Sequence, residues 1–369
     1  MTSGQSLLKV KKFAYLIGPA VLLLPALSFL LGAYLGISEV QAWFSLLMLL
    51  FVTPMADFLL GKDEYNPNEQ EQAELAASRY FDHCLKLVVP LQFFNVLFGA
   101  YIFQSGHFEG INQFGWLMSC GLISGAVAIN TAHELVHRDG KFEPFLGGLL
   151  LSTVSYATFK VEHLRGHHVN VATPEDASSS RKGEGVYAFL LRAIPNNVKN
   201  AWRLEAIRLN NKGLPWYSLY NELIVWTALS ALFALSLFLY WGISGLAFFI
   251  GQSFFAIVTL EIINYIEHYG LERKRLPNGK YERVNHRHSW NSSFLLTNIL
   301  LWQLQRHSDH HMQAKRRYQL LSVYPDSPQL PAGYATMFIL ALVPWAWRRV
   351  VDPILESHQA DTNKLAAQG

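Results

Sequence analysis

The sequence is poor in charge and in cysteine. Only 15% of its 369 residues are charged, whereas soluble domains usually carry about a quarter. The two cysteines, Cys84 and Cys120, are too few for a disulfide scaffold, and the absence of a CxxC pair excludes zinc-ribbon and iron–sulfur motifs. The net charge of +3 is too small and too dispersed to indicate nucleic-acid binding. With 51% hydrophobic residues, the composition also excludes disordered, collagen-like and coiled-coil chains.

Long hydrophobic runs dominate what is present. A helix needs about 20 residues to cross a bilayer, and the runs do not alternate as the strands of a membrane barrel would. Six runs are long enough: residues 13–34, 42–60, 85–103, 114–131, 223–240 and 242–264. The sequence therefore predicts an all-α chain, folded as a single membrane domain over residues 1–369 with a bundle of six transmembrane helices.

The basic residues predict the orientation of this bundle. The connections around Ser38, His107 and Gly242 contain no Lys or Arg, and basic residues are retained on the cytoplasmic side of a membrane. Both termini are therefore expected in the cytoplasm. Residues 132–221 and 265–352 then form a cytoplasmic cap, followed by a loose tail over residues 353–369. The shorter apolar runs 145–159 and 334–347 are expected at the membrane interface, the first of them as a re-entrant or interfacial segment.

Histidine is unevenly distributed. Nine of the 14 histidines fall into four clusters, HELVH, EHLRGHH, NYIEHYGLER and QRHSDHH, all on the predicted cytoplasmic side. The nine are His133, His137, His163, His167, His168, His268, His307, His310 and His311. His83, His107 and His358 are interpreted as interfacial or hydrogen-bonded side chains. The same interpretation is favoured for His286 and His288, with a metal role as the alternative.

The spacing within the clusters is typical of metal ligands. Residues three or four apart share one face of a helix, so three clusters can each direct two or more rings to one point: His133 with His137, His163 with His167, and His307 with His310 and His311. Neutral imidazole binds iron, copper, nickel and zinc. Nine rings are too many for one ion and suit two. A carboxylate adjoins a histidine in each cluster, and we expect it to hydrogen-bond a ring of a neighbouring turn; the four are Glu134, Glu162, Glu267 and Asp309.

Two other classes of metal protein compete with this interpretation. HELVH fits the H-E-x-x-H pattern of zinc proteases, with Glu134 as general base, but a protease needs only one further ligand and would leave most of the histidines without a role. A metal transporter would carry ionisable groups at mid-membrane. The middles of the six runs are nearly free of such groups, and the exceptions, Asp57 and Glu261, both lie toward the cytoplasmic ends.

The four strings resemble the signatures of the integral-membrane non-haem diiron alkane 1-monooxygenases, the alkane hydroxylases. HELVHR, EHLRGHHVNVATPEDASS, NYIEHYGLER and LQRHSDHH match nearly letter for letter. The resemblance implies that the nine histidines named above bind two iron ions, which use O2 to convert alkanes into 1-alkanols, without a separate catalytic acid or base. It also implies a bacterial inner membrane. A xylene-type methyl monooxygenase, or another membrane diiron oxygenase or desaturase, remains the alternative.

The resemblance further implies a separate rubredoxin as electron donor, itself reduced by an NAD(P)H-dependent reductase. The clusters Arg273–Arg275 and Lys315–Arg317 are candidates for its docking surface, because a basic surface attracts an acidic donor. An alkane is bound through apolar area alone, so its pocket is expected between the spans, open toward lipid. Phe58, Phe93 and Phe94 are candidates for limiting the length of the alkane.

Overall fold

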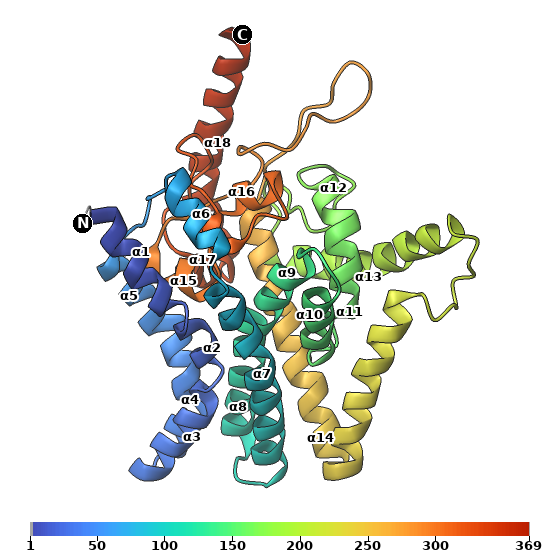
Figure 1. The fold of residues 1–369 in the computed structure, drawn as a ribbon. Coiled ribbons are helices and arrows are strands. Elements are labelled where there is room, and N and C mark those ends of the chain that lie inside the picture. Colours follow the sequence, from blue (N-terminus) through green and yellow to red (C-terminus); the bar gives the residue numbers. More distant parts are fainter. Residues whose placement is uncertain (1–2, 369) are drawn as a thin grey trace.

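The computed structural model describes residues 3–368, and its long apolar helices point to one end of the molecule (Figure 1). Within these residues the structure is helical, and β-pairing is limited to isolated bridges. Four continuous helices are long and apolar enough to cross a membrane. They are Ser38–Leu60 (α4 Ser38–Leu47, η1 Met48–Val52, α5 Thr53–Leu60), Tyr80–Gln104 (α7), Gly110–Val136 (α8 Gly110–Ile123, η2 Ser124–Ile129, α9 Asn130–Val136) and Glu222–His268 (α14).

The first apolar run is bent, where the sequence predicts a continuous span. It consists of α1 (Ser3–Ala14), α2 (Ile17–Val21) and α3 (Leu24–Leu35), and the axis turns by 69° between α2 and α3. Pro25 occupies the first turn of α3, where proline starts a new helix but cannot continue the preceding hydrogen-bond ladder. Counting the bent pair as one span gives up to five candidates. The chain is therefore a membrane protein.

Helix α14 is a hairpin rather than one straight rod. Its 47 residues would extend roughly 70 Å as a single helix, over twice the thickness of a bilayer core. Gly242 breaks it with a positive φ of 63°, a conformation that glycine adopts without strain. The two arms return alongside each other (Figure 1), and the rings of Phe233 and Phe249 meet at 5.6 Å across them.

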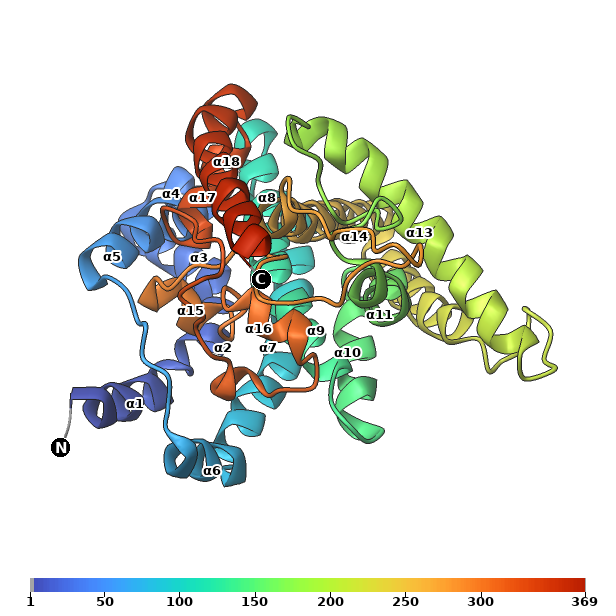
Figure 2. The same cartoon turned by 90° about the horizontal axis from the view of Figure 1, so that it is seen from above.

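The other helices, most of them short, gather around the other end of the bundle. Viewed from above, α9 and α16 lie side by side near the middle, with α11 and the end of α14 next to them (Figure 2). These helices are α6 (Glu69–Ala77), α10 (Phe142–Ser152), α11 (Ala157–Glu162), η3 (His163–His167), α12 (His168–Asn170), α13 (Val186–Asn210), α15 (Leu295–Leu300), α16 (His307–Met312), η4 (Tyr318–Leu320) and α17 (Tyr334–Ala341). Helix α10 covers most of the apolar run 145–159 and is too short to span a membrane.

The segment expected as a loose tail is helical up to Gln368, and Gly369 lies outside the described residues. Helix α18 runs from Pro344 to Gln368. Val351 and Leu355, four residues apart, are fully buried, and the Tyr269 hydroxyl donates a hydrogen bond to Asp352 at 2.8 Å. Polar composition beyond residue 352 hid this short apolar stripe, which anchors the helix to the end of α14.

Candidate metal centre

The nine clustered histidines converge at one place in the molecule. They come from α9 and its end, from η3 and α12, from the last residue of α14, and from α16. Their ring nitrogens form two groups, in each of which the potential ligand atoms lie within 4.8 Å of one another. The first group contains His133, His137, His163, His168 and His310, and the second contains His167, His268, His307 and His311.

The EHLRGHH cluster is divided between the two groups, although helical spacing predicts that His163 and His167 share one point. Residues His163–His167 form a π-helix, in which hydrogen bonds connect residues five apart. This winding brings His168 to the side of His163, with their Nε2 atoms 3.0 Å apart. His167 is thereby directed to the second group. The one-residue change in helical period therefore decides which ring belongs to which group.

The QRHSDHH cluster is divided as well, because α16 lies between the groups. The Nε2 atoms of His307 and His311 are 2.9 Å apart, as four-residue spacing predicts. His310 faces the other way, and its Nε2 lies 3.1 Å from that of His168 in the first group. One short helix thus supplies ligand candidates to both groups.

The rings are buried and several of their nitrogens lack a partner. Eight of the nine histidines are buried, and His168 is half-buried. The Nε2 atoms of His133 and His167 have no hydrogen-bond partner, which is costly for a buried polar atom. Separations of about 3 Å between ring nitrogens, such as 2.9 Å between His137 and His163, match ligands that each lie ~2.1 Å from a common ion.

The charge state of the rings also suits a metal. Burial and the neighbouring imidazoles hold the pKa of His163, His168 and His310 well below its ordinary value. These rings are therefore neutral near pH 7, which is the form of imidazole that binds a metal.

Asp176 contacts a histidine of the second group and was not predicted from the sequence. Its carboxylate accepts hydrogen bonds from His167 Nδ1 at 2.9 Å and from the Ser179 hydroxyl at 2.6 Å. Burial lowers the pKa of His167, but the Asp176 carboxylate outweighs this effect and raises it. Such a bond fixes the ring tautomer, so that Nε2 keeps its lone pair for a metal. The string VATPEDASS contains this residue, but its distance of nine positions from His167 gives no local signal.

The four predicted carboxylates have different partners. Glu267 Oε2 lies 3.3 Å from His307 Nε2. The other three contact groups outside the imidazole rings. Glu134 pairs with Arg138 at 2.7 Å, Glu162 accepts from the Asn200 amide at 3.2 Å, and Asp309 pairs with Arg316 at 2.8 Å. These three carboxylates thus connect the histidine-bearing helices to their surroundings.

The remaining histidines lie outside both groups. His107 Nε2 bonds to Gln41 at 2.8 Å near the opposite end of the bundle. His288 lies 3.3 Å from Glu282, and His286 stacks on the Tyr324 ring. Neither group includes His83 or His358.

Several known proteins are similar in sequence to this chain. The family model described as Fatty acid desaturase matches residues 112–341. Alkane 1-monooxygenase 2 of Alcanivorax borkumensis is 49% identical, with 100% of this chain and 97% of the relative covered. Alkane 1-monooxygenase 1 of Pseudomonas aeruginosa is 47% identical, with 97% and 94% covered. The chain belongs to the alkane 1-monooxygenase family. The xylene/toluene monooxygenase hydroxylase component of Pseudomonas putida is more distant, at 27% identity over 68% of each chain.

The donor set fits the metal of this family. Both groups consist of imidazole nitrogens, and imidazole is a good ligand for iron. A structural zinc ion would usually be held by four ligands, with cysteine prominent among them, whereas both cysteines lie outside the two groups. The two histidine groups and the family together indicate iron binding.

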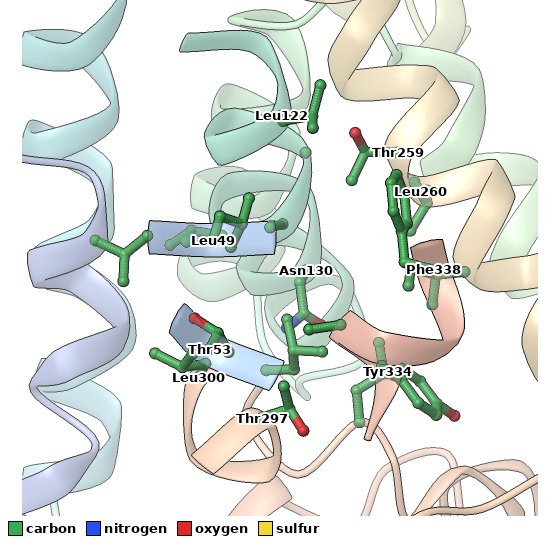
Figure 3. Close-up of a pocket in the computed structure, with 18 of the residues that line it drawn as sticks. Leu49, Thr53, Leu122, Asn130, Thr259, Leu260, Thr297, Leu300, Tyr334 and Phe338 are labelled. Carbon is green, nitrogen blue, oxygen red and sulfur yellow. The ribbon is translucent and has the colours of Figure 1, made fainter. Parts of the chain in front are cut away.

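An apolar pocket lies between the helices next to the histidines (Figure 3). Its lining comes from α2, η1, α5, α8, η2, α9, α14, α15 and α17 and from the segment that follows α15. Half-buried residues such as Leu49 and Thr53 lie toward the outside. At the inner end, Asn130 and Leu304 also line a small cavity that includes His133 and His310. In this alkane 1-monooxygenase family member, an apolar pocket and the first histidine group are therefore neighbours.

The three phenylalanines expected to limit alkane length do not line this pocket. Phe58 is 80% exposed on the outer face of α5. Phe94 stacks on Phe98 with ring centroids 5.5 Å apart, and Phe93 contacts Phe233 at 5.6 Å. The sequence showed that these aromatics lie in spans but gave no information about the face on which each one lies.

Proposed function

We propose that this protein is an alkane 1-monooxygenase that inserts one oxygen atom of O2 into a terminal methyl group and releases a 1-alkanol. The observation that carries the proposal is that Asn130 and Leu304 line both the apolar pocket and the small cavity at His133 and His310 of the first histidine group. The names of the relatives at 47% and 49% identity support the same reaction.

Two iron ions are proposed, one for each histidine group. The first would be held by His133, His137, His163, His168 and His310, and the second by His167, His268, His307 and His311. When bound, the iron supplies the oxidation of a carbon–hydrogen bond that no side-chain acid or base could activate. The protein supplies fixed ligands, and Asp176 orients the His167 ring.

The pocket between the helices would bind the alkane. An alkane offers no polar group, so its affinity comes from burial at ~0.8 kcal/mol for each CH2. A chain that enters between η1 and α17 reaches Asn130 and Leu304 before it reaches the cavity at His133. The half-buried outer residues support entry from lipid, where alkanes partition. The end of the chain would arrive first, which explains oxidation at the terminal carbon.

The proposed topology has six spans in one domain. The bent pair α2–α3 would contribute one span, the two arms of α14 would contribute two, and the other three helices one each. The distribution of basic residues supports an inner-membrane orientation with both termini in the cytoplasm, and residues 132–221 and 265–352 would then form the cap over the irons. Helix α18 would extend this cap.

A separate rubredoxin, reduced by an NAD(P)H-dependent reductase, is the proposed electron donor. Some side chains of the two predicted basic clusters are already bonded to other residues of the chain. Arg273 donates to the backbone of Val169 and Glu282, and Arg316 pairs with Asp309. Lys315 is exposed and pairs with the equally exposed Asp139. The docking surface would therefore consist of the outer residues of each cluster. Association with the donor would then depend moderately on salt concentration.

The test is turnover of an alkane series with purified rubredoxin and its reductase, together with iron analysis. We expect 1-alkanols and two irons per chain. His310→Ala should lose iron from the first group and lose activity, whereas His107→Ala should leave both unchanged, because His107 lies outside both groups. Oxidation of aryl methyl groups in preference to alkanes would instead indicate a xylene-type enzyme. One tightly bound zinc ion with peptide cleavage would contradict the proposal.

A further inference from the structure

One polar side chain of the apolar pocket, Asn130, has an amide nitrogen without a hydrogen-bond partner among the residues that the structure describes. Four of the pocket's five polar lining residues are already hydrogen-bonded within the protein. The Thr53 and Thr259 hydroxyls donate to the backbone oxygens of Met48 and Phe255, the Thr297 hydroxyl donates to Asp57, and the Tyr334 hydroxyl donates to Trp290 O. The amide nitrogen of Asn130 is buried and has no hydrogen-bond partner. This is a costly arrangement unless a ligand supplies the partner.

Asn130 lies between the apolar pocket and the first histidine group. It is 3% exposed and begins α9 immediately after the π-helix η2. Its position is one helical turn before His133, so both side chains project from the same face. In Figure 3 it lies in the middle of the lining residues, between Leu49 and Thr53 on one side and Leu260 and Phe338 on the other. It also lines the small cavity at His133 and His310.

We propose that the Asn130 amide binds the hydroxyl group of the 1-alkanol product and so positions the oxidised end of the chain at the inner end of the pocket. The proposal rests on the proposed alkane oxidation. An alkane cannot satisfy an amide, because it has neither donor nor acceptor. A hydroxyl group has both, so it can pair with the nitrogen or the oxygen of the amide.

Asn130 is thus a positioning residue, and its amide discriminates between the alkane substrate and the alkanol product. The remaining lining gives both compounds nearly the same apolar contacts, because they share the same chain. Their affinities therefore differ mainly through the contact at the inner end. The difference is measurable without turnover, and it is independent of the activity of the iron-loaded enzyme.

The experiment compares the binding of isotope-labelled decane and 1-decanol to the full chain in nanodiscs, without O2 or an electron donor. Empty nanodiscs give the background partition into lipid. We expect Asn130→Leu, which has a similar shape, to weaken 1-decanol binding about threefold to tenfold, the range for one neutral hydrogen bond. Decane binding should stay the same or strengthen. Thr259→Val is the matched control, because its hydroxyl is already bonded at 2.7 Å, and the affinity ratio of the two ligands should not change.

Iron content and unfolding temperature show whether each variant keeps its fold. Asn130→Ala removes the amide without adding bulk and should change the ratio in the same direction, so the result does not depend on how Leu packs. If wild-type protein binds neither compound, the proposed function itself fails. If it binds both, and neither Asn130 variant changes the ratio, the inference about Asn130 is overturned while alkane oxidation stands.

Discussion

At the scale of single residues, the site depends on side chains that hold the imidazoles in place. Asp176 accepts hydrogen bonds from both His167 and Ser179. It therefore connects a ring of the second group to the loop after α12. Partners of this kind typically change metal affinity 10–100-fold when they are removed. The orientation of His167 is thus determined outside the histidine motifs themselves.

We expect Asp176→Asn to weaken iron binding about tenfold or more, because the amide can present its nitrogen to His167 and loses the negative charge. The measurement is iron retained per chain during titration with a chelator. Asp139→Asn is the control, since Asp139 is a surface residue that pairs only with exposed Lys315. Equal iron retention in the wild type and Asp176→Asn would contradict a role in orienting His167.

A second residue tests where the alkane lies. Ala335 is a half-buried lining residue on α17, whereas Phe58 is an exposed residue of α5 outside the pocket. We expect Ala335→Phe to shift the product distribution toward shorter alkanols, because the larger ring fills part of the channel. Phe58→Ala should leave the distribution unchanged. The readout is gas-chromatographic product analysis over a mixed alkane series, and a shift caused by the Phe58 variant alone would place the substrate elsewhere.

At the scale of secondary-structure elements, Glu205 connects three helices, α13, η3 and α14. From α13 it pairs with Arg165 of η3 at 2.5 Å and with Arg208 at 2.6 Å, and it accepts the first backbone N–H of α14, from Glu222, at 2.8 Å. Burial alone would raise the pKa of Glu205, but the hydrogen bonds from Arg208 and Glu222 and the charge of Arg165 lower it to about 2. Glu205 therefore couples the histidine-bearing η3 to the hairpin of α14.

This coupling predicts a dependence on pH. Because the pKa is lower in the folded chain than its ordinary value of about 4.5, ionised Glu205 stabilises the fold above that value, and the stabilisation disappears as pH falls toward 2. We expect the unfolding temperature in detergent to fall between pH 5 and pH 3, and the fall to be smaller in Glu205→Gln. The variant should also be less stable at pH 7. Parallel pH profiles for the two proteins would contradict the prediction.

The secondary-structure elements also show how much of the fold could be predicted from the sequence. The apolar runs predicted the helices, because lipid-facing segments must satisfy their backbone groups internally. They did not predict the bend between α2 and α3 or the helical continuation of α18 beyond residue 352, where the composition is mostly polar and Leu355 is a buried apolar side chain. Histidine spacing located the site but not its two groups, because a π-helix changes the period at His163–His167. Asp176 was missed because its contact with His167 depends on the fold of a loop.

At the scale of the whole molecule, exposed apolar side chains follow the long helices. Leu30, Phe51 and Leu239 are each more than 60% exposed, which would be unfavourable in water and is expected in lipid. The segment before α14 carries exposed Trp216, Tyr217 and Tyr220, residues that are enriched where a membrane meets water. Under the proposed topology, these aromatic side chains would lie at the boundary of the bilayer close to Glu222, with the histidine groups on the cytoplasmic side of it.

The topology can be tested by labelling single cysteines, because both natural cysteines are buried and should react poorly. Tyr240 is 85% exposed next to the turn at Gly242, and Lys315 is exposed at the other end. We expect a membrane-impermeant maleimide to label Tyr240→Cys in intact spheroplasts and to label Lys315→Cys only after the membrane is opened. Wild-type protein gives the background, and retained iron shows that each variant is folded. The proposed orientation, which rests on the basic residues, would put the histidine groups on the same side as a cytoplasmic rubredoxin. The reversed labelling pattern would therefore contradict both the topology and donation by such a rubredoxin.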